Sequence, residues 1–324
     1  MARSPVPWDV LAALYSIVFV TALGVALVVA WGPLDVILGP AVWAVLLGFL
    51  VVFIGLGYGL SGRNAAIATM ALTIGAMVVG GQVARVLDFE TKAMGFPLAD
   101  ATLASWDAWL GLNWRGYYDW QAQHGEISFV LEWLYRPTQL FVAATVVLLT
   151  VRGRHRDAAT FGVAIASALV ICVVIGGFFP AVGPYGYFGI PDHGIAPWAA
   201  LLPDIVGGRV TVAYLAKLPA LTTFPSYHSA VAILAALACR RAGRVGIALS
   251  VVNLVWLAGV PVWGDHYFVD VIAGVLIGAL CHFALFRWLG VERVSARVAA
   301  ATKPAMVAVP VEEVLQQGGQ PPHS

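Results

Sequence analysis

Two short polar stretches, each followed by an apolar run, carry residue types that can act on a phosphate. The first is Phe-Pro-Ser-Tyr-His at 224–228, here called the FPSYH motif. A serine can cap the free amides of a following helix, and a helix N-terminus offers N–H groups and a positive dipole end to an anion. We expect His228 to lie at such a helix end, with Ser226 and Tyr227 as further phosphate or substrate contacts. A plain helix cap with an interfacial histidine is the alternative.

The second stretch is Gly-Asp-His-Tyr-Phe-Val-Asp at 264–270, here called the GDHYFVD motif. His266 and Asp270 are four residues apart, so they would share one face of a helix. A carboxylate bonded to one ring nitrogen sets the tautomer and leaves the other nitrogen free to attack or to take up a proton. A purely structural His–Asp pair is one alternative. A metal site that includes Asp265 is disfavoured, because no third imidazole or cysteine stands at ligand spacing.

The composition indicates the elements that must position these residues. Of 324 residues, 60% are hydrophobic and 11% are charged, whereas soluble domains carry about 25% charged residues. No basic run interleaved with aromatic residues indicates a nucleic-acid partner, and the net charge of +1 favours no partner. Cys172, Cys239 and Cys281 all lie in apolar runs without a CxxC pattern, so we predict buried thiols, with neither disulfides nor a zinc site.

A membrane-spanning helix needs about 20 mostly apolar residues. The candidate runs cover 10–31, 38–61, 65–87, 128–150, 158–179, 228–245, 246–264 and 268–290. The first run is longer than the apolar core of a signal peptide and no clear cleavage site follows it, so we expect it to be retained. The sequence therefore predicts an all-α membrane protein with about eight transmembrane helices.

The positions of Lys and Arg predict the orientation of these spans, because cytoplasmic loops are enriched in positive residues. With eight spans and a cytoplasmic N-terminus, twelve of these residues fall on the cytoplasmic side, five fall on the other side and Arg136 falls within a span. Both motifs then open spans from the extracytoplasmic face, and an up-and-down helix pair would bring them together. We expect a multi-pass protein of the plasma (inner) membrane with its site on that face.

The segments outside the apolar runs add three expectations. Leu103, Trp106 and Leu110 recur at helical spacing, which predicts an amphipathic helix in the membrane interface. Its headgroup anchors would be Trp106, Trp109, Trp114 and Trp120. The tail at 298–324 is rich in Ala, Pro and Gln and is predicted to be disordered. The domain prediction is an N-terminal transmembrane hairpin at 1–64, a catalytic membrane domain at 65–297 and this tail.

The two motifs together resemble the second and third motifs of the type 2 phosphatidic acid phosphatase superfamily. The run His-Tyr-Phe-Val-Asp-Val at 266–271 is closer to its inositol phosphorylceramide synthase and sphingomyelin synthase branch, and Pro180-Ala-Val-Gly-Pro184 is similar to a turn in that branch. The resemblance covers roughly 128–290. It implies a six-helix phosphatase-like core behind two extra N-terminal helices, and metal-free chemistry without a cofactor.

The resemblance also implies roles for individual residues. His266 would be the nucleophile that forms a phosphohistidine, Asp270 would orient it, and His228 would act as general acid and then as general base. The phosphatase pattern has Lys, six residues and then Arg-Pro, but Phe129 stands at the lysine position before Arg136-Pro137. Gly259 and Val260 replace a Ser-Arg pair of the pattern.

Two cationic phosphate ligands of the family pattern are therefore missing. The candidate replacements are Arg209 and Lys217 in the loop before the FPSYH motif, and Arg136. Surface or headgroup-facing charges are the alternative for the first two residues. An intramembrane ion pair with Glu132 is the alternative for Arg136.

These observations predict a lipid phosphate phosphatase or a transferase of a phospho-headgroup on a phospholipid, a polyprenyl phosphate or a sphingolipid. The partners would be the lipid phosphate substrate and the bilayer, while the oligomeric state stays open. A hydrolase would use water as acceptor and a transferase would use an alcohol, and the sequence favours neither. A non-catalytic lipid-binding or transport protein on the same scaffold is the rival interpretation.

Overall fold

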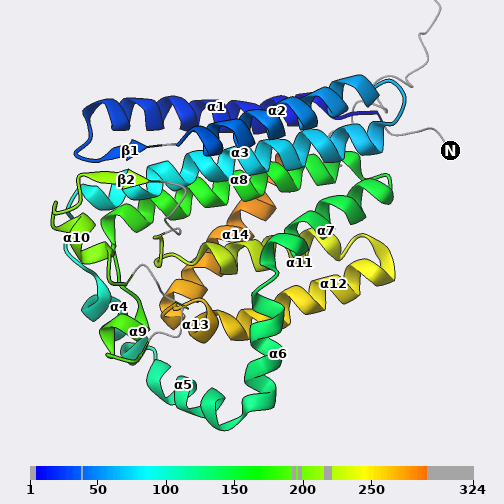
Figure 1. Cartoon of the computed structure of the whole chain (residues 1–324). Coiled ribbons are helices and arrows are strands. Elements are labelled where there is room, and N and C mark those ends of the chain that lie inside the picture. The colour runs from blue at the N-terminus through cyan, green and yellow to red at the C-terminus, as the bar shows by residue number, and fades with distance from the viewer. Residues whose placement is uncertain (1–4, 38, 192–194, 196–198, 215–220, 290–324) are drawn as a thin grey trace, which may run out of the picture.

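Apolar helices run side by side through most of the protein, as the computed structural model shows (Figure 1). The structure describes residues 5–289 except 38, 192–194, 196–198 and 215–220. Lys217 and the predicted tail at 298–324 therefore lie outside the described residues. The long helices are α1 (Trp8–Trp31), α2 (Pro40–Leu60), α3 (Ala65–Ala93), α8 (His155–Phe178) and α14 (Phe268–Leu289).

Shorter elements complete the bundle and its loops. In the bundle lie α6 (Gly125–Tyr135), α7 (Thr138–Val151), α11 (Tyr227–Cys239) and α12 (Gly243–Val255), which continues through η2 (Trp256–Gly259) and α13 (Val260–Trp263). At its edge lie α4 (Asp100–Trp109), α5 (Trp114–Gln123), α9 (Pro184–Tyr187) and α10 (Leu202–Val206). Strands β1 (Asp35–Ile37) and β2 (Val212–Tyr214) form a parallel pair with Asp35 opposite Val212.

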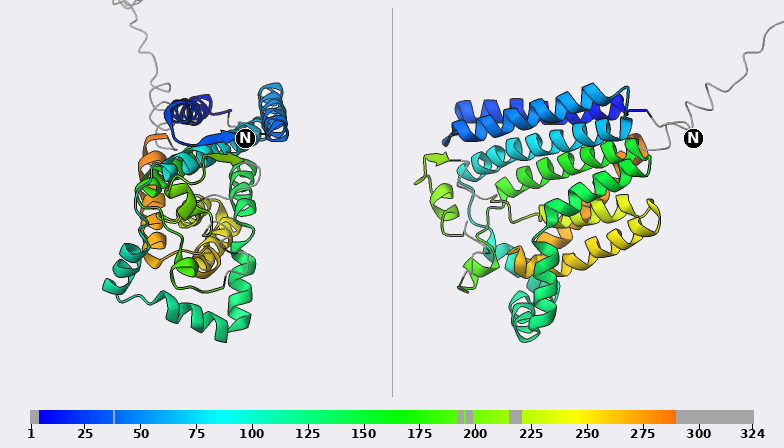
Figure 2. Two further views of the ribbon diagram at one scale, coloured as in Figure 1. Left: turned by 60° about the vertical axis from the view of Figure 1, so that its left-hand side comes forward. Right: turned by 45° about the vertical axis from the view of Figure 1, so that its right-hand side comes forward.

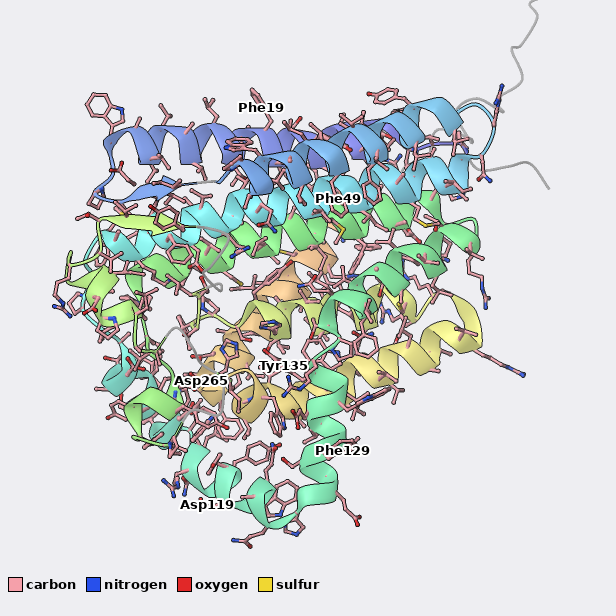
Figure 3. All side chains as sticks on the ribbon, in the orientation of Figure 1. Phe19, Phe49, Asp119, Phe129, Tyr135 and Asp265 are labelled. Atoms are coloured by element: carbon pink, nitrogen blue, oxygen red, sulfur yellow. The ribbon has the colours of Figure 1, made fainter. Side chains whose placement is uncertain are left out.

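The prediction of an all-α membrane protein is confirmed. Within the described residues, six helices, α12 being counted with its continuation to Trp263, are long and apolar enough to cross a bilayer, and the bent pair α6–α7 would make a seventh. The remaining predicted run, 228–245, corresponds to α11, which has only 13 residues, so the count of eight spans stays a prediction. Large apolar side chains such as Phe19 on α1 and Phe129 on α6 project outward (Figure 3), as lipid-facing surfaces require.

The N-terminal hairpin forms an outer layer of the bundle (Figure 2). Both α1 and α2 lie against α3, and α1 also contacts α8. One end of the bundle carries the α2–α3, α7–α8 and α11–α12 turns, while β1, β2, α4, α9 and α10 lie at the opposite end (Figure 1). The predicted basic turns and the loops that surround the two motifs are therefore separated by the length of the helices.

The helices that follow the two motifs pack closely against each other. A side chain at Gly274 of α14 would collide with the backbone of α11, because its Cβ would lie 2.1 Å from the Ser226 carbonyl oxygen. Small residues let helix backbones approach in this way. The α11–α14 contact therefore brings the starts of both helices to one place, as expected for an up-and-down pair.

The predicted span 128–150 is not one straight helix. It breaks between α6 and α7, which meet at an angle of 55°. Pro137 stands at the break, where a proline removes a backbone donor and disfavours a helical residue before it. The bend leaves Tyr135 at the end of α6, pointing toward the centre of the bundle (Figure 3).

A helix is present at the predicted place as α4, but the interpretation of one tryptophan was wrong. Trp109 is 85% exposed, as a headgroup anchor should be, whereas Trp114 is buried and its Nε1 donates to the Pro261 carbonyl at 2.9 Å. The two aspartates of this helix, Asp100 and Asp107, are also buried. Both carboxylates face the protein, where they accept backbone N–H groups at 182–183 and 268–269.

Candidate active site

The pairing of His266 with Asp270 is found in the structure. His266 Nδ1 lies 3.4 Å from Asp270 Oδ2, and both side chains are buried. The same carboxylate oxygen accepts the Tyr267 backbone N–H at 2.9 Å. One expectation was wrong in detail: His266 does not lie on the helix, which begins at Phe268. It lies in the turn just before it, close enough for the carboxylate to hold one ring nitrogen.

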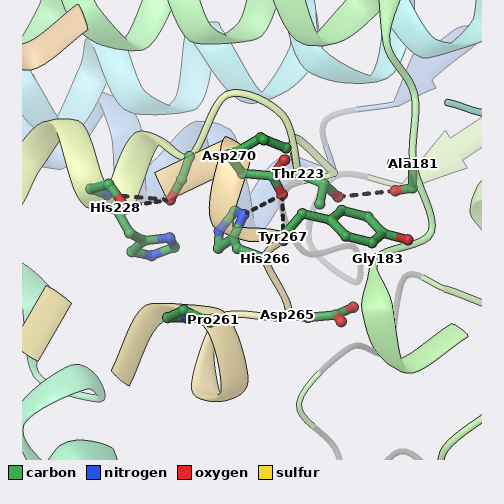
Figure 4. A network of polar contacts seen from close by, with 12 residues as sticks. Ala181, Gly183, Thr223, His228, Pro261, Asp265, His266, Tyr267 and Asp270 are labelled. Atoms are coloured by element: carbon green, nitrogen blue, oxygen red, sulfur yellow. Dashed lines mark hydrogen bonds and ion pairs between the residues drawn. The ribbon is translucent and has the colours of Figure 1, made fainter. Parts of the chain in front are cut away.

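The FPSYH motif meets this pair directly (Figure 4). The Ser226 backbone N–H donates to the Asp270 carbonyl oxygen at 3.0 Å. The rings of His228 and His266 lie 6.1 Å apart between centroids. His228 Nδ1 also lies 3.3 Å from the hydroxyl of Tyr135. Groups that are 38 residues apart thus face one another, with His228 oriented by a tyrosine from a third helix.

The predicted roles of Ser226 and Tyr227 can be compared with their positions. Ser226 is the N-cap of α11, and its Oγ accepts the Ser229 N–H at 3.3 Å. Its side chain is fully buried, so it shapes the helix end rather than facing open space. Tyr227 packs against the main apolar core and lines a cavity that also reaches His228.

Two carboxylates from α4 hold the turn that carries His266. Asp107 accepts the N–H groups of Phe268 at 2.9 Å and Val269 at 2.8 Å, and so caps the start of α14 from another helix. Asp100 accepts the Tyr267 hydroxyl at 3.0 Å together with two backbone N–H groups at 182–183. These bonds anchor both the GDHYFVD motif and the loop before α9.

The loop at 180–185 packs tightly against the same turn. Gly183 has a φ of +92° and its Cβ would lie 2.1 Å from Asp265 Oδ2, so only glycine fits there. Asp265 itself has a φ of +54° and accepts the Tyr185 N–H at 2.9 Å. Such left-handed residues cluster at functional sites when the surrounding contacts hold them. The Gly-Pro turn is therefore a wall of the site.

Burial determines the protonation of the groups outside the spans. Burial lowers the pKa of His266 to about 3, the nearby His228 acts in the same direction, and a hydrogen bond with the Thr223 backbone opposes both. The imidazole of His266 is therefore neutral at physiological pH. Burial raises the pKa of Asp100 and of Asp107, and the backbone N–H groups that each accepts act against this change.

The predicted phosphate anchors lie at different places. Arg209 pairs with Asp204 on the surface, and its side chain is 63% exposed. Arg136 pairs with Glu132, as its alternative interpretation expected, and is 70% exposed. Lys217 lies outside the described residues. Both described anchors thus pair with a neighbouring acid at the surface rather than with His228 or His266.

Several residues of the site were not identified from the sequence. Asp100 and Asp107 are seven apart, two helical turns, and two acids on one face of a helix were the available signal. Tyr135 directly precedes the Arg136-Pro137 pair. Its side chain faces His228 because the chain bends between α6 and α7, and the sequence did not predict this bend. Arg85, counted among the five positive residues of the extracytoplasmic side, lies within α3 and lines the cavity that reaches His228.

Comparison with known proteins gives one match. A family model described as the PAP2 superfamily matches residues 101–285, which is more than half of the chain and includes both motifs. No curated protein and no solved structure matches the chain.

Proposed function

The chain belongs to the PAP2 superfamily, and from this premise we propose that it is a membrane-embedded lipid phosphatase or phosphotransferase with a phosphohistidine intermediate. Membership supports an activity of the phosphatase type on a lipid phosphate. The observation that carries the finer proposal is the meeting of His228, His266 and Asp270 at one end of the bundle. Nucleophile, orienting carboxylate and second histidine are then within reach of one phosphorus atom.

The first chemical step follows from this arrangement. The neutral His266 attacks phosphorus through Nε2, because Asp270 holds Nδ1. The bond from phosphorus to the ester oxygen breaks as the new N–P bond forms. His228 gives its proton to the leaving alcohol. The amides at the start of α11 and its dipole support the developing negative charge on the phosphoryl oxygens.

The second step regenerates the enzyme. His228, now neutral, takes a proton from water or from an acceptor alcohol, whose oxygen attacks phosphorus while the N–P bond breaks. Water gives a phosphatase and an alcohol gives a transferase. The His-Tyr-x-x-Asp-Val run at 266–271 supports the inositol phosphorylceramide and sphingomyelin synthase-like branch, in which the acceptor is an alcohol.

The location of the site is also part of the proposal. The turns with Arg63, Arg152 and Arg240 lie at one end of the bundle and the motif loops lie at the other (Figure 1). Since positive loops face the cytoplasm, this separation supports an active site on the extracytoplasmic face of the plasma (inner) membrane.

The test is turnover of a natural lipid phosphate and of an activated phosphoester by three variants, with EDTA present. His266→Gln should abolish turnover, because an amide nitrogen is not nucleophilic. Asp270→Asn should be severely slowed with a trace of activity. His228→Gln should slow the natural ester far more than the activated one, whose leaving group needs little protonation.

Matched controls come from exposed positions of α5 and its C-cap. His124→Gln and Asp119→Asn should keep wild-type rates, because the exposed His124 ring contacts Trp120 and Asp119 pairs with Arg115 at the surface. A fully active His266→Gln enzyme, or inactivation by chelator that added metal reverses, would refute the phosphohistidine mechanism.

A further inference from the structure

A cavity inside the helix bundle reaches His228, one of the two candidate catalytic histidines. It has a volume of about 550 Å³ and is walled by α1, α3, α7, α8 and α11. His228 and Tyr227 belong to its lining. Small-molecule sites in proteins measure about 300–1,000 Å³. The cavity is thus large enough for part of a lipid, and it reaches His228 of the proposed site.

The lining of this cavity is polar at one end and apolar at the other. Most of the polar side chains stand in the carboxyl half of α3 and at the amino ends of α7 and α11: Gln82, Arg85, Thr138, Gln139 and His228, with Thr21 on α1 as a further one. Because α7 and α11 run opposite to α3, these positions lie at the same end of the bundle. The remainder is lined mainly by aliphatic side chains, among them Ile17, Ile74, Met77, Val146 and Ile165. This gradient matches a ligand with one charged head and a hydrocarbon chain.

Arg85 supplies the positive charge at the polar end. Its side chain is only partly exposed, and Nη1 donates to Gln82 Oε1 at 3.0 Å. A charge at this depth of a spanning helix is costly and usually serves a function. A guanidinium can donate two parallel hydrogen bonds to a phosphate. Arg136 and Arg209, in contrast, are exposed and are not part of this lining.

We infer that this cavity holds the substrate, a lipid phosphate whose chain lies in the apolar half and whose phosphate lies between Arg85 and His228. The inference rests on the proposed function and names the substrate class and the phosphate-binding residue. It makes α1 of the N-terminal hairpin part of the substrate site. Arg85 would also provide a positive charge for the phosphate, which the chain needs because the two cationic ligands of the family pattern are missing.

The chain-binding half is tested by filling the cavity. Gly81 lines it, and no atom lies within 4 Å of where its Cβ would stand, so Gly81→Leu projects into open space. Gly55→Leu is the matched control, since Gly55 on α2 is equally open but lines no part of the cavity. In nanodiscs, Gly81→Leu should weaken equilibrium binding of dodecylphosphonate at least about tenfold, while Gly55→Leu binds as the wild type. Ala143→Leu on α7 fills the opposite wall as a second variant.

The phosphate-binding half is tested by removing the charge. Arg85→Met keeps an unbranched side chain and should weaken dodecylphosphonate binding at least about tenfold, the size of one charge-assisted hydrogen bond. Binding of dodecanol, which has the chain without the charge, should change much less. Arg85→Lys should restore part of the loss, and Arg115→Met, at an exposed pair with Asp119, is the control. Thermal unfolding of each variant identifies any that fails to fold.

The outcomes separate this inference from the proposed function. Wild-type phosphonate binding by Gly81→Leu, Ala143→Leu and Arg85→Met would overturn the inference even if the enzyme turns over lipid phosphates. Loss of binding in Arg209→Ala or Arg136→Ala, with normal binding in Arg85→Met, would overturn the assignment of Arg85. If the variants lose binding as expected but the wild-type protein neither cleaves nor transfers a phosphoester, the cavity would be supported as a lipid phosphate site. The proposed enzymatic activity would then be refuted.

Discussion

Replacing Asp107 by alanine is expected to disturb the catalytic pair without touching it. Asp107 accepts the backbone N–H groups of Phe268 and Val269 at 2.9 and 2.8 Å. These two residues stand between His266 and Asp270 in the chain, so the carboxylate holds the segment that sets the distance between imidazole and carboxylate. In Asp107→Ala both N–H groups lose their acceptor.

The size of the effect follows from these two bonds. A buried donor left without an acceptor costs about 1–3 kcal/mol, so two cost about 2–6 kcal/mol. Asp107 also lines a groove of about 620 Å³ between α4 and α9, and water can enter the vacated place from there. We therefore expect the lower limit, about 2 kcal/mol. If this free energy destabilises only the conformation in which His266 and Asp270 are paired, turnover falls roughly thirtyfold.

The assay is turnover of an activated phosphoester together with the midpoint of thermal unfolding. Asp107→Ala should lose roughly thirtyfold in rate and unfold at a lower temperature. Asp107→Asn should be intermediate in both rate and unfolding temperature. Its amide oxygen can accept one of the two backbone N–H groups, whereas its NH2 group cannot accept the other. Asp119→Ala, at an exposed ion pair with Arg115, is the matched control. A lowered unfolding temperature with wild-type turnover would refute the idea that this cap positions the site.

Four further outcomes are expected. Because burial lowers the pKa of His266, turnover of an activated ester should stay level as the pH falls from about 8 to about 5. An inflection near about pH 6.5 would contradict this expectation. Ala200→Cys should react with an impermeant thiol reagent in intact cells, and labelling only after permeabilisation would contradict the proposed orientation. Arg209→Ala and Lys217→Ala should keep wild-type turnover if Arg85 anchors the phosphate, and a loss of about tenfold in either would support the sequence-based prediction of an anchor in the loop before α11. Gly183→Ala should lose most activity, because its Cβ would strike Asp265, and a fully active variant would show that this loop can move away without harm.

The helices and the meeting of the two motifs could be predicted from the sequence. Apolar runs of sufficient length dictate helices in a bilayer, because every backbone N–H needs an internal partner there. Two spans joined by a short basic turn must return to the same side. His228 and His266 therefore had to lie at one end, and the helix cap by Ser226 was visible in its residue type.

The supports of the site could not be predicted from local pattern. A helical stripe of Leu103 and Trp106 predicts that α4 has an apolar face, but it does not reveal what the polar face meets. Asp100 and Asp107 find backbone donors at 182–183 and 268–269 only after the chain has folded. The sequence therefore suggested an interfacial helix. In the structure, the same helix holds the turn that carries His266 through hydrogen bonds accepted by its two aspartates.

The departure from the family pattern at Gly259 and Val260 has a structural counterpart. A Cβ on Gly259 would lie 3.1 Å from the Leu131 carbonyl oxygen, because α6 packs directly on this residue. Val260 is fully buried beside Trp256. A serine side chain at 259 would push the Leu131 backbone of α6 by a few tenths of an ångström, and α6 carries Tyr135, whose hydroxyl lies 3.3 Å from His228 Nδ1. Since this place is occupied by packing, the cation for a phosphate has to come from another helix, and Arg85 on α3 already shares a cavity with His228.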